Sequence, residues 1–138
     1  MEITRREALI GTLLPFVQAV SGTAQSQPIQ RAQNTVFEHD LPNLAMDGWQ
    51  VNASIITLPP GSAGAPHHHP GFVLVYVLEG EVVTKISDQQ QATYSTGQMF
   101  YEQPGSTHEV SRNASTTKPA KFLAMIFAKK GLPLVTPA

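Results

Sequence analysis

The sequence of 138 residues contains no cysteine. Disulfide bonds, zinc–thiolate sites, iron–sulfur clusters and thiol catalysis are therefore excluded. Charge is also scarce, because Asp, Glu, Lys and Arg together make up 14% of the residues and the formal net charge is −1. A chain with so little positive charge offers no electrostatic basis for binding nucleic acid or an anionic membrane surface.

Several enzyme motifs are missing as well. The sequence has no Gly-x-Ser-x-Gly elbow, no phosphate-binding loop and no paired-carboxylate signature, so it does not support a serine hydrolase or a nucleotide-binding protein. No segment after residue 24 has a convincing helical period. What the chain does contain is 41% apolar residues, 11 prolines and 10 glycines. In one domain of this length, that composition favours an all-β fold with many turns.

Residues 1–24 have the pattern of an export signal. Arg5 and Arg6 precede an apolar segment over residues 8–20, and small residues follow at 21–24. The apolar segment is too short and too interrupted to span a membrane, so we expect no stable membrane insertion after processing. The start of the segment resembles a twin-arginine signal, with Ala8 where Phe is usual, and the alternative is an ordinary secretory signal. Both interpretations predict a periplasmic or secreted protein.

Short strands separated by Gly and Pro turns account for most of the remaining chain. We interpret the polar residues 25–34 as an N-terminal arm and residues 35–138 as one domain. The pattern predicts strands at 35–38, 50–58, 72–78, 81–87, 92–94, 98–103, 108–112 and 122–128. Residues 72–78 are apolar on both faces, so a second sheet or a partner subunit must cover the outer face. Strands at this spacing indicate a sandwich or a barrel.

Three consecutive histidines, His67, His68 and His69, stand between a Pro-Pro-Gly turn and an apolar segment. In an extended segment His67 and His69 point to one side and His68 to the other. Two neutral imidazoles one residue apart form a chelating pair for a divalent metal. The alternative is a surface run that binds metal loosely. His39 is far from this run in the sequence, and we interpret it as a surface or capping residue.

These histidines and a second group of residues resemble the two motifs of the small single-domain cupins. The first motif is Gly, five residues, His-x-His, three or four residues, Glu, six residues and Gly; the matching positions are Gly61, His67, His69 and Gly80. The second motif has a Gly, a strand, a Pro-Gly turn, a third His and a closing Asn; the matching positions are Gly97, Pro104, Gly105, His108 and Asn113. The resemblance covers about residues 35–128. It implies an all-β jelly-roll barrel, also called a double-stranded β-helix.

The resemblance also implies a metal site inside the barrel. His67, His69 and His108 would be its ligands, and three imidazoles suit Fe, Mn, Zn, Ni or Cu without choosing among them. The sequence departs from the family at Val73, which occupies the position of the usual carboxylate ligand. A valine cannot bind a metal, so the usual set of three histidines and one glutamate is incomplete.

Glu102 offers a replacement for the missing carboxylate. Phe100 matches an inward-facing position of the family, and strand alternation puts Glu102 on the same face. A buried carboxylate is unfavourable unless it is paired or bound to a cation. We therefore expect Glu102 either to bind the metal or to act beside it as a base. The alternative is a frayed strand end that leaves Glu102 in solvent. His68 should face away, as a surface residue or as a support for the ligands.

An exported metalloenzyme is the leading functional hypothesis. Dioxygenase-type oxidation of a small aromatic or enolic compound is favoured, because cupin sites with three histidines and open coordination positions favour it, and Glu102 would move a proton. Isomerase or lyase chemistry on a small oxo-acid is a second possibility. A non-catalytic module that binds a metal or ligand is the alternative from another class. The doubly apolar segment 72–78, together with the habit of such barrels, predicts a homodimer.

Overall fold

The computed structural model describes residues 33–138. The predicted export signal at 1–24 and nearly all of the predicted arm at 25–34 lie outside the described residues. Within residues 33–138 the chain forms strands and no helix, so this part contains no helix that could cross a membrane. The strands are β1 (Trp49–Leu58), β2 (Ala63–Gly64), β3 (His67–His68), β4 (Phe72–Glu79), β5 (Glu81–Ile86), β6 (Ala92–Ser95), β7 (Met99–Glu102), β8 (Thr107–Asn113), β9 (Ala120–Lys129) and β10 (Thr136–Pro137).

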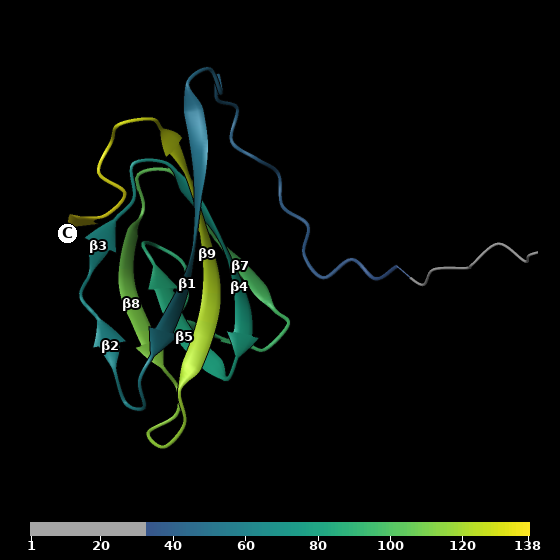
Figure 1. Cartoon of the computed structure of the whole chain (residues 1–138), viewed down its shortest axis with the longest axis vertical. Helices are drawn as coiled ribbons and strands as arrows, with labels where there is room; N and C mark the ends of the chain where they lie inside the picture. The colour runs from purple at the N-terminus through teal and green to yellow at the C-terminus, as the bar shows by residue number, and fades with distance from the viewer. Residues whose placement is uncertain (1–32) are drawn as a thin grey trace, which may run out of the picture. The chain divides into compact units, whose positions relative to one another are not determined.

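Two antiparallel sheets face one another and enclose the core (Figure 1). One sheet has the order β1-β9-β4-β7. The other has the order β10-β3-β8-β5-β6, and β2 also pairs with β8. Strands that are distant in sequence are neighbours in both sheets, as in a jelly roll. The expected all-β jelly-roll barrel is confirmed.

The core lies between the two sheets and follows the alternation of their strands. Its residues are buried aliphatic and aromatic side chains, namely Val73, Val75, Val77, Val82, Ile86, Phe100, Ala120, Phe122, Ala124, Ile126 and Ala128. Full burial of a Val or Phe side chain contributes about 1.5–3 kcal/mol. Because every second residue of β4 and β9 is committed to this core, the face on which each side chain lies is strongly fixed.

Two glycines of the motif pattern occupy turns that a larger residue would strain. Gly80, between β4 and β5, has φ of 73°, and a Cβ added there would lie 2.9 Å from the carbonyl oxygen of Pro119. Gly105 has φ of 76° in the turn between β7 and β8. Glycine adopts this left-handed conformation without the steric cost of a side chain. The second turn returns the chain so that His108, the second residue of β8, lies near Glu102 at the end of β7.

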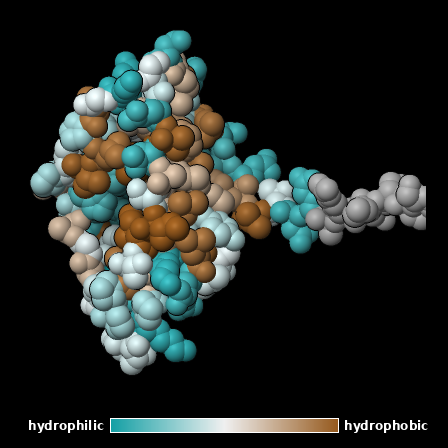
Figure 2. Space-filling model, viewed as in Figure 1, coloured by the Kyte–Doolittle hydropathy of each residue, from teal (hydrophilic) through white to brown (hydrophobic). Residues whose placement is uncertain are grey.

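The outer face of the four-stranded sheet is apolar and only partly covered. Alternation and register assign to this outer face Val51, Ala53, Ile55, Leu74, Tyr76, Met99, Tyr101, Leu123, Met125 and Phe127. Val51 is 54% exposed and Ile55 is 67% exposed. Figure 2 shows apolar residues gathered over the region where β1 and β9 lie in Figure 1. The second sheet covers the inner face of β4, whereas much of the outer face remains open in the described chain.

The strand predicted at residues 35–38 is wrong. This segment has no regular secondary structure, and no described strand pairs with it. A strand needs a neighbour for its backbone hydrogen bonds, and side-chain alternation alone does not supply one. The segment continues to His39, which is exposed and whose ring centroid lies 4.1 Å from that of Tyr101. His39 is thus a surface residue on the outer face.

Candidate metal centre

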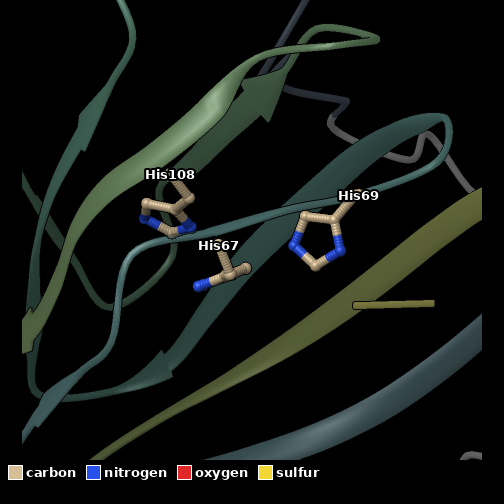
Figure 3. Close-up of side chains that lie close together, drawn as sticks. All are labelled: His67, His69 and His108. Atoms are coloured by element: carbon tan, nitrogen blue, oxygen red, sulfur yellow. The ribbon is translucent and has the colours of Figure 1, made fainter. Parts of the chain in front are cut away.

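His67, His69 and His108 lie together inside the barrel. His67 is the direct cross-strand partner of His108 in the pairing of β3 with β8. His69 follows β3 by one residue and lies on the same side as His67, with 4.9 Å between their ring centroids. Each ring offers a nitrogen, and these three nitrogens lie within 4.8 Å of one another. Figure 3 shows the three rings gathered from the two neighbouring segments.

Hydrogen bonds to backbone carbonyls orient two of the rings. The Nδ1 atom of His67 lies 2.8 Å from the carbonyl oxygen of Ala65, and that of His69 lies 2.8 Å from the carbonyl oxygen of Leu134. A carbonyl oxygen only accepts hydrogen bonds, so each Nδ1 atom carries the hydrogen. The Nε2 atoms of both rings therefore keep a free lone pair. Metal-binding histidines are commonly fixed in this manner.

The third ring is held by Thr84. Its hydroxyl lies 2.6 Å from Nε2 of His108, in a contact between β5 and β8 that is buried. His108 is 4% exposed, and its other ring nitrogen, Nδ1, has no hydrogen-bond partner. A buried nitrogen without a partner is unfavourable by about 1–3 kcal/mol. The unpartnered Nδ1 atom is thus the one that remains available to a ligand.

Glu102 lies beside the histidines and is not exposed to solvent. The residue is 3% exposed, which excludes the frayed, solvated strand end considered above. Its Oε1 atom is 3.1 Å from Nδ1 of His108, and its Oε2 atom is 3.6 Å from Nε2 of His69. Oε1 and the His108 nitrogen are close without forming a hydrogen bond. Glu102 is also the direct partner of Val73 in the pairing of β4 with β7. The carboxylate therefore lies one strand away from its usual place in the family.

These contacts fit a bound cation. Three imidazole nitrogens and a carboxylate converge, and hydrogen bonds hold the far side of each ring. No hydrogen bond to the Glu102 carboxylate is found within residues 33–138. An ionised carboxylate without donors in an apolar interior needs a positive partner. His67, His69 and His108 could thus hold a divalent metal. The role of Glu102 as a further ligand or as a base stays a prediction.

Burial lowers the pKa of His69 below its ordinary value of 6.5. The hydrogen bond to Leu134 and the nearby Glu102 carboxylate act in the opposite direction, but burial is the largest influence. A lowered pKa keeps the imidazole neutral at pH 7. The neutral form is the one that binds a metal.

The candidate metal centre opens into a cavity of about 260 Å³ between the sheets. Its polar lining comes from the three histidines, Glu102 and Ser111. The apolar lining residues are Ile56, Leu58, Gly64, Val73, Val75, Phe122, Ala124, Ile126 and Val135. Neither Lys nor Arg is among the described residues that line it. The cavity suits a small ligand with an apolar skeleton and one end that interacts with the metal.

Sequence reasoning missed three contributors to this site. Thr84 lies between Val82 and Ile86 on the same, buried face of β5. A polar residue among apolar ones on the inner face was therefore a recognisable signal. Ser111 lines the cavity although it is three residues after His108. A register shift between β5 and β8 adds one residue to β8 there, so that the side chains after it that face inward change by one position. Bulges of this kind redirect side chains near functional sites. The carbonyl oxygen of Leu134 left no sequence signal, because every residue carries a backbone carbonyl oxygen and the residue type does not show which of them meets His69.

His68 faces away from the candidate metal centre, as alternation predicted. Its Nδ1 atom lies 3.2 Å from the carbonyl oxygen of Ser106 and 3.3 Å from the hydroxyl of Thr107. These contacts join β3 to the start of β8 and place no ring atom at the metal centre. His68 therefore supports the packing of the two segments that carry the ligands.

Comparison with protein families identifies a cupin domain over residues 54–126. The match spans more than half of the chain, and the protein belongs to the cupin family. No curated protein matches the sequence at a significant level.

Solved structures share the fold. An uncharacterised conserved protein with a double-stranded β-helix domain from Klebsiella pneumoniae is 20% identical with a TM-score of 0.54, over 64% of this chain and 74% of that one. A predicted oxalate decarboxylase from Thermotoga maritima is 26% identical with a TM-score of 0.51, over 59% of this chain and 69% of that one. The DMSP lyase DddQ from Ruegeria pomeroyi is 17% identical with a TM-score of 0.56. That match covers 64% of this chain but 43% of the lyase.

Proposed function

We propose that this cupin is an exported, metal-dependent enzyme that oxidises a small aromatic or enolic compound by dioxygenase-type chemistry. The observation that carries the proposal is a buried carboxylate beside three convergent imidazoles at the wall of an apolar cavity. A bound metal would supply positive charge and open coordination positions to a substrate oxygen. Dioxygenation puts both atoms of O₂ into the product, so the reaction requires no further reductant.

Glu102 is the residue suited to move a proton. Its carboxylate oxygens face the ring nitrogens of His69 and His108 at 3.6 and 3.1 Å, so a substrate hydroxyl at the metal centre would lie within its reach. As a general base it would accept the hydroxyl proton, which leaves the substrate oxygen negatively charged beside the cation. Because the carboxylate is buried, water does not compete strongly for that proton.

The cavity walls favour an uncharged carbon skeleton. Ile56, Phe122 and Ile126 offer apolar surface to a ring or a short chain, and the cavity volume of about 260 Å³ limits its size. A second anionic group on the substrate would find no Lys or Arg among the described lining residues. The lining therefore supports a phenol or an enol more than a dicarboxylate.

Lyase or isomerase chemistry on a small oxo-acid is the second candidate. A base beside a metal can also remove a proton next to a carbonyl group. The likeness to a predicted oxalate decarboxylase, at 26% identity, supports this class. A non-catalytic module is the third candidate, in which the same residues hold a metal in a closed coordination sphere for storage or sensing.

Elemental analysis of the untagged protein is the first test. We compare the unchanged chain with His108→Ala and Glu102→Gln after purification and again after reloading with Fe, Mn, Zn, Ni and Cu. We expect near-stoichiometric metal in the unchanged chain, loss in His108→Ala and weaker binding in Glu102→Gln. A complete absence of metal from all three would overturn the metalloenzyme proposal.

Oxygen consumption separates the three candidates. The metal-loaded protein is incubated with a panel of catechols, enols and oxo-acids in an oxygen electrode and, in parallel, under nitrogen. Dioxygenase-type chemistry predicts oxygen uptake that Glu102→Gln abolishes. If turnover proceeds equally without oxygen, the dioxygenase proposal is wrong and the lyase or isomerase candidate is favoured. Tight zinc without turnover would favour the binding module.

A further inference from the structure

The C-terminal tail, residues 132–138, lies against the candidate metal centre. Its strand β10 pairs with β3, so that Thr136 is the partner of His68 and Pro137 is the partner of His67. The side chain of Leu134 packs against the hydrophobic core. Figure 1 shows the tail, in yellow, beside β3. The tail is therefore attached both to the ligand-bearing segment and to the core.

One backbone carbonyl of the tail controls the orientation of His69. His69 lies just beyond the end of β3, so the sheet does not hold its backbone there. The hydrogen bond from its Nδ1 atom to the carbonyl oxygen of Leu134, at 2.8 Å, fixes the ring instead. This bond selects the tautomer with hydrogen on Nδ1. It leaves a lone pair on Nε2, the atom that lies 3.6 Å from Glu102.

The next residue of the tail, Val135, stands at the mouth of the cavity. The cavity has a neighbouring surface groove that is lined by Gly64, Ala65, Pro66, His67, Val135 and Pro137. Gly64, His67 and Val135 line both the groove and the inner cavity. Of these three, only Val135 belongs to the tail, and it is 54% exposed. Its side chain therefore lies where the outer groove meets the cavity that holds the metal centre.

We propose that the tail is a working part of the metal centre, in which the Leu134 carbonyl positions His69 and the Val135 side chain restricts access to the cavity. The tail belongs to neither of the two cupin motifs. The purpose of the tail rests on the proposed function. The orientation of His69 and the access to the cavity, however, are both measurable in the metal-free protein. Failure of metal binding and failure of this inference are thus distinguishable.

The positioning role is tested with the pair Leu134→Asp and Leu132→Asp in the full chain. A carboxylate at 134 cannot pack against the core and should detach the tail. The matched change at Leu132 adds the same charge at a site that is 45% exposed. Long-range ¹H–¹⁵N spectra of the imidazoles, recorded without metal above pH 7, report which ring nitrogen carries hydrogen. Deletion of residues 132–138 is the second variant, in case Leu134→Asp does not fold.

We expect His69 to lose its single Nδ1–H tautomer in Leu134→Asp and to keep it in Leu132→Asp. His67, whose Nδ1 atom donates to Ala65, should keep its tautomer in both variants. Metal affinity should fall about 10–100-fold in Leu134→Asp only. An unchanged His69 tautomer in a folded Leu134→Asp or deletion variant would overturn the positioning role. If the tautomer changes although no metal binds to any variant, the positioning role stands and the proposed function fails.

The access role is tested with Val135→Ala and Val135→Trp. Diethyl pyrocarbonate modifies neutral imidazoles, and mass spectrometry resolves the rate at each histidine of the metal-free protein. His108 lies inside the cavity, so its modification should accelerate severalfold in Val135→Ala and slow severalfold in Val135→Trp. Exposed His39 serves as the internal control and should react equally in all three proteins. Equal rates at His108 in all three would overturn the access role.

Discussion

Val73 and Glu102 are direct partners in the antiparallel pairing of β4 with β7. Cross-strand partners extend from the same face of a sheet with their Cβ atoms about 4.5–5.5 Å apart. Both residues line the cavity, and Glu102 reaches two of the histidines. The carboxylate that Val73 cannot supply is thus available from the adjacent strand.

This pairing predicts that the carboxylate can be moved back. Glu102→Val should lower metal affinity at least about tenfold, because it removes a negative charge beside the cation. The double variant Glu102→Val with Val73→Glu should recover most of the affinity, since the two side chains enter the same space. Titration with Mn²⁺ or Zn²⁺ measures both effects. Val73→Glu alone places two carboxylates together and serves as the control. No recovery in the double variant would contradict the exchange of positions.

The contact between Thr84 and His108 predicts a role for a hydroxyl that no motif identifies. Thr84→Val keeps the shape but leaves Nε2 of His108 buried without a partner. We expect a loss of about 1–3 kcal/mol in the free energy of unfolding. Metal affinity should fall about tenfold or more, because the ring is no longer held. Urea unfolding and metal titration measure the two effects. Thr93→Val, at an exposed position of β6, should change neither.

The lowered pKa of His69 predicts that the metal-free protein loses stability in acid. The folded state holds this imidazole neutral, whereas the unfolded chain binds a proton near its ordinary pKa of 6.5. The contribution of His69 is therefore complete above that pH and is lost as the pH falls from 6.5 towards the folded value. Unfolding free energies between about pH 8 and pH 5 measure this dependence.

His69→Gln should make the same curve flatter across this pH range. His39→Gln, at an exposed site on the outer face, should leave the slope unchanged. An equally steep fall in His69→Gln would assign the acid sensitivity to another group.

The outer face of the four-stranded sheet predicts a homodimer. We propose that a second copy covers it, because β1 has no further strand at its edge within residues 33–138 and none of its residues is charged or proline. Natural edge strands usually carry such residues to prevent pairing. Sedimentation velocity at micromolar concentration should show a dimer. Ile55→Lys should convert it to a monomer, and Thr93→Lys on the other sheet should not. If the unchanged protein is a monomer at this concentration, the homodimer proposal is wrong.

Export is predicted from residues outside the described part of the chain. We propose the twin-arginine route, which requires both arginines, whereas an ordinary secretory signal requires only positive charge. Arg5→Lys with Arg6→Lys should therefore hold the protein in the cytoplasm of a bacterial host. Ala8→Phe restores the usual motif residue and should preserve export. Cell fractionation measures both, and continued export of the double-lysine variant would indicate the ordinary secretory route.

The sequence alone determined the features that depend on neighbouring residues. A period of two residues places His67 and His69 together, and the same period puts Glu102 on the inner face beside Phe100. Pro-Gly and Glu-Gly turns predicted where β7 and β4 end. These inferences succeeded because strand geometry fixes the direction of a side chain from its position in the strand.

Tertiary structure decided which residues meet across the barrel. The strand register places Val73 directly opposite Glu102. Folding also brings the carbonyl oxygen of Leu134 to His69, which is 65 positions earlier in the chain. Segment 35–38 has a strand-like pattern, yet it pairs with no strand in the described part of the chain. Alternation specifies the face of a strand, but partners and register follow from which faces can be buried together. The lone pairs that His69 and His108 keep free depend on distant contacts with Leu134 and Thr84, so the metal centre is completed only in the folded chain.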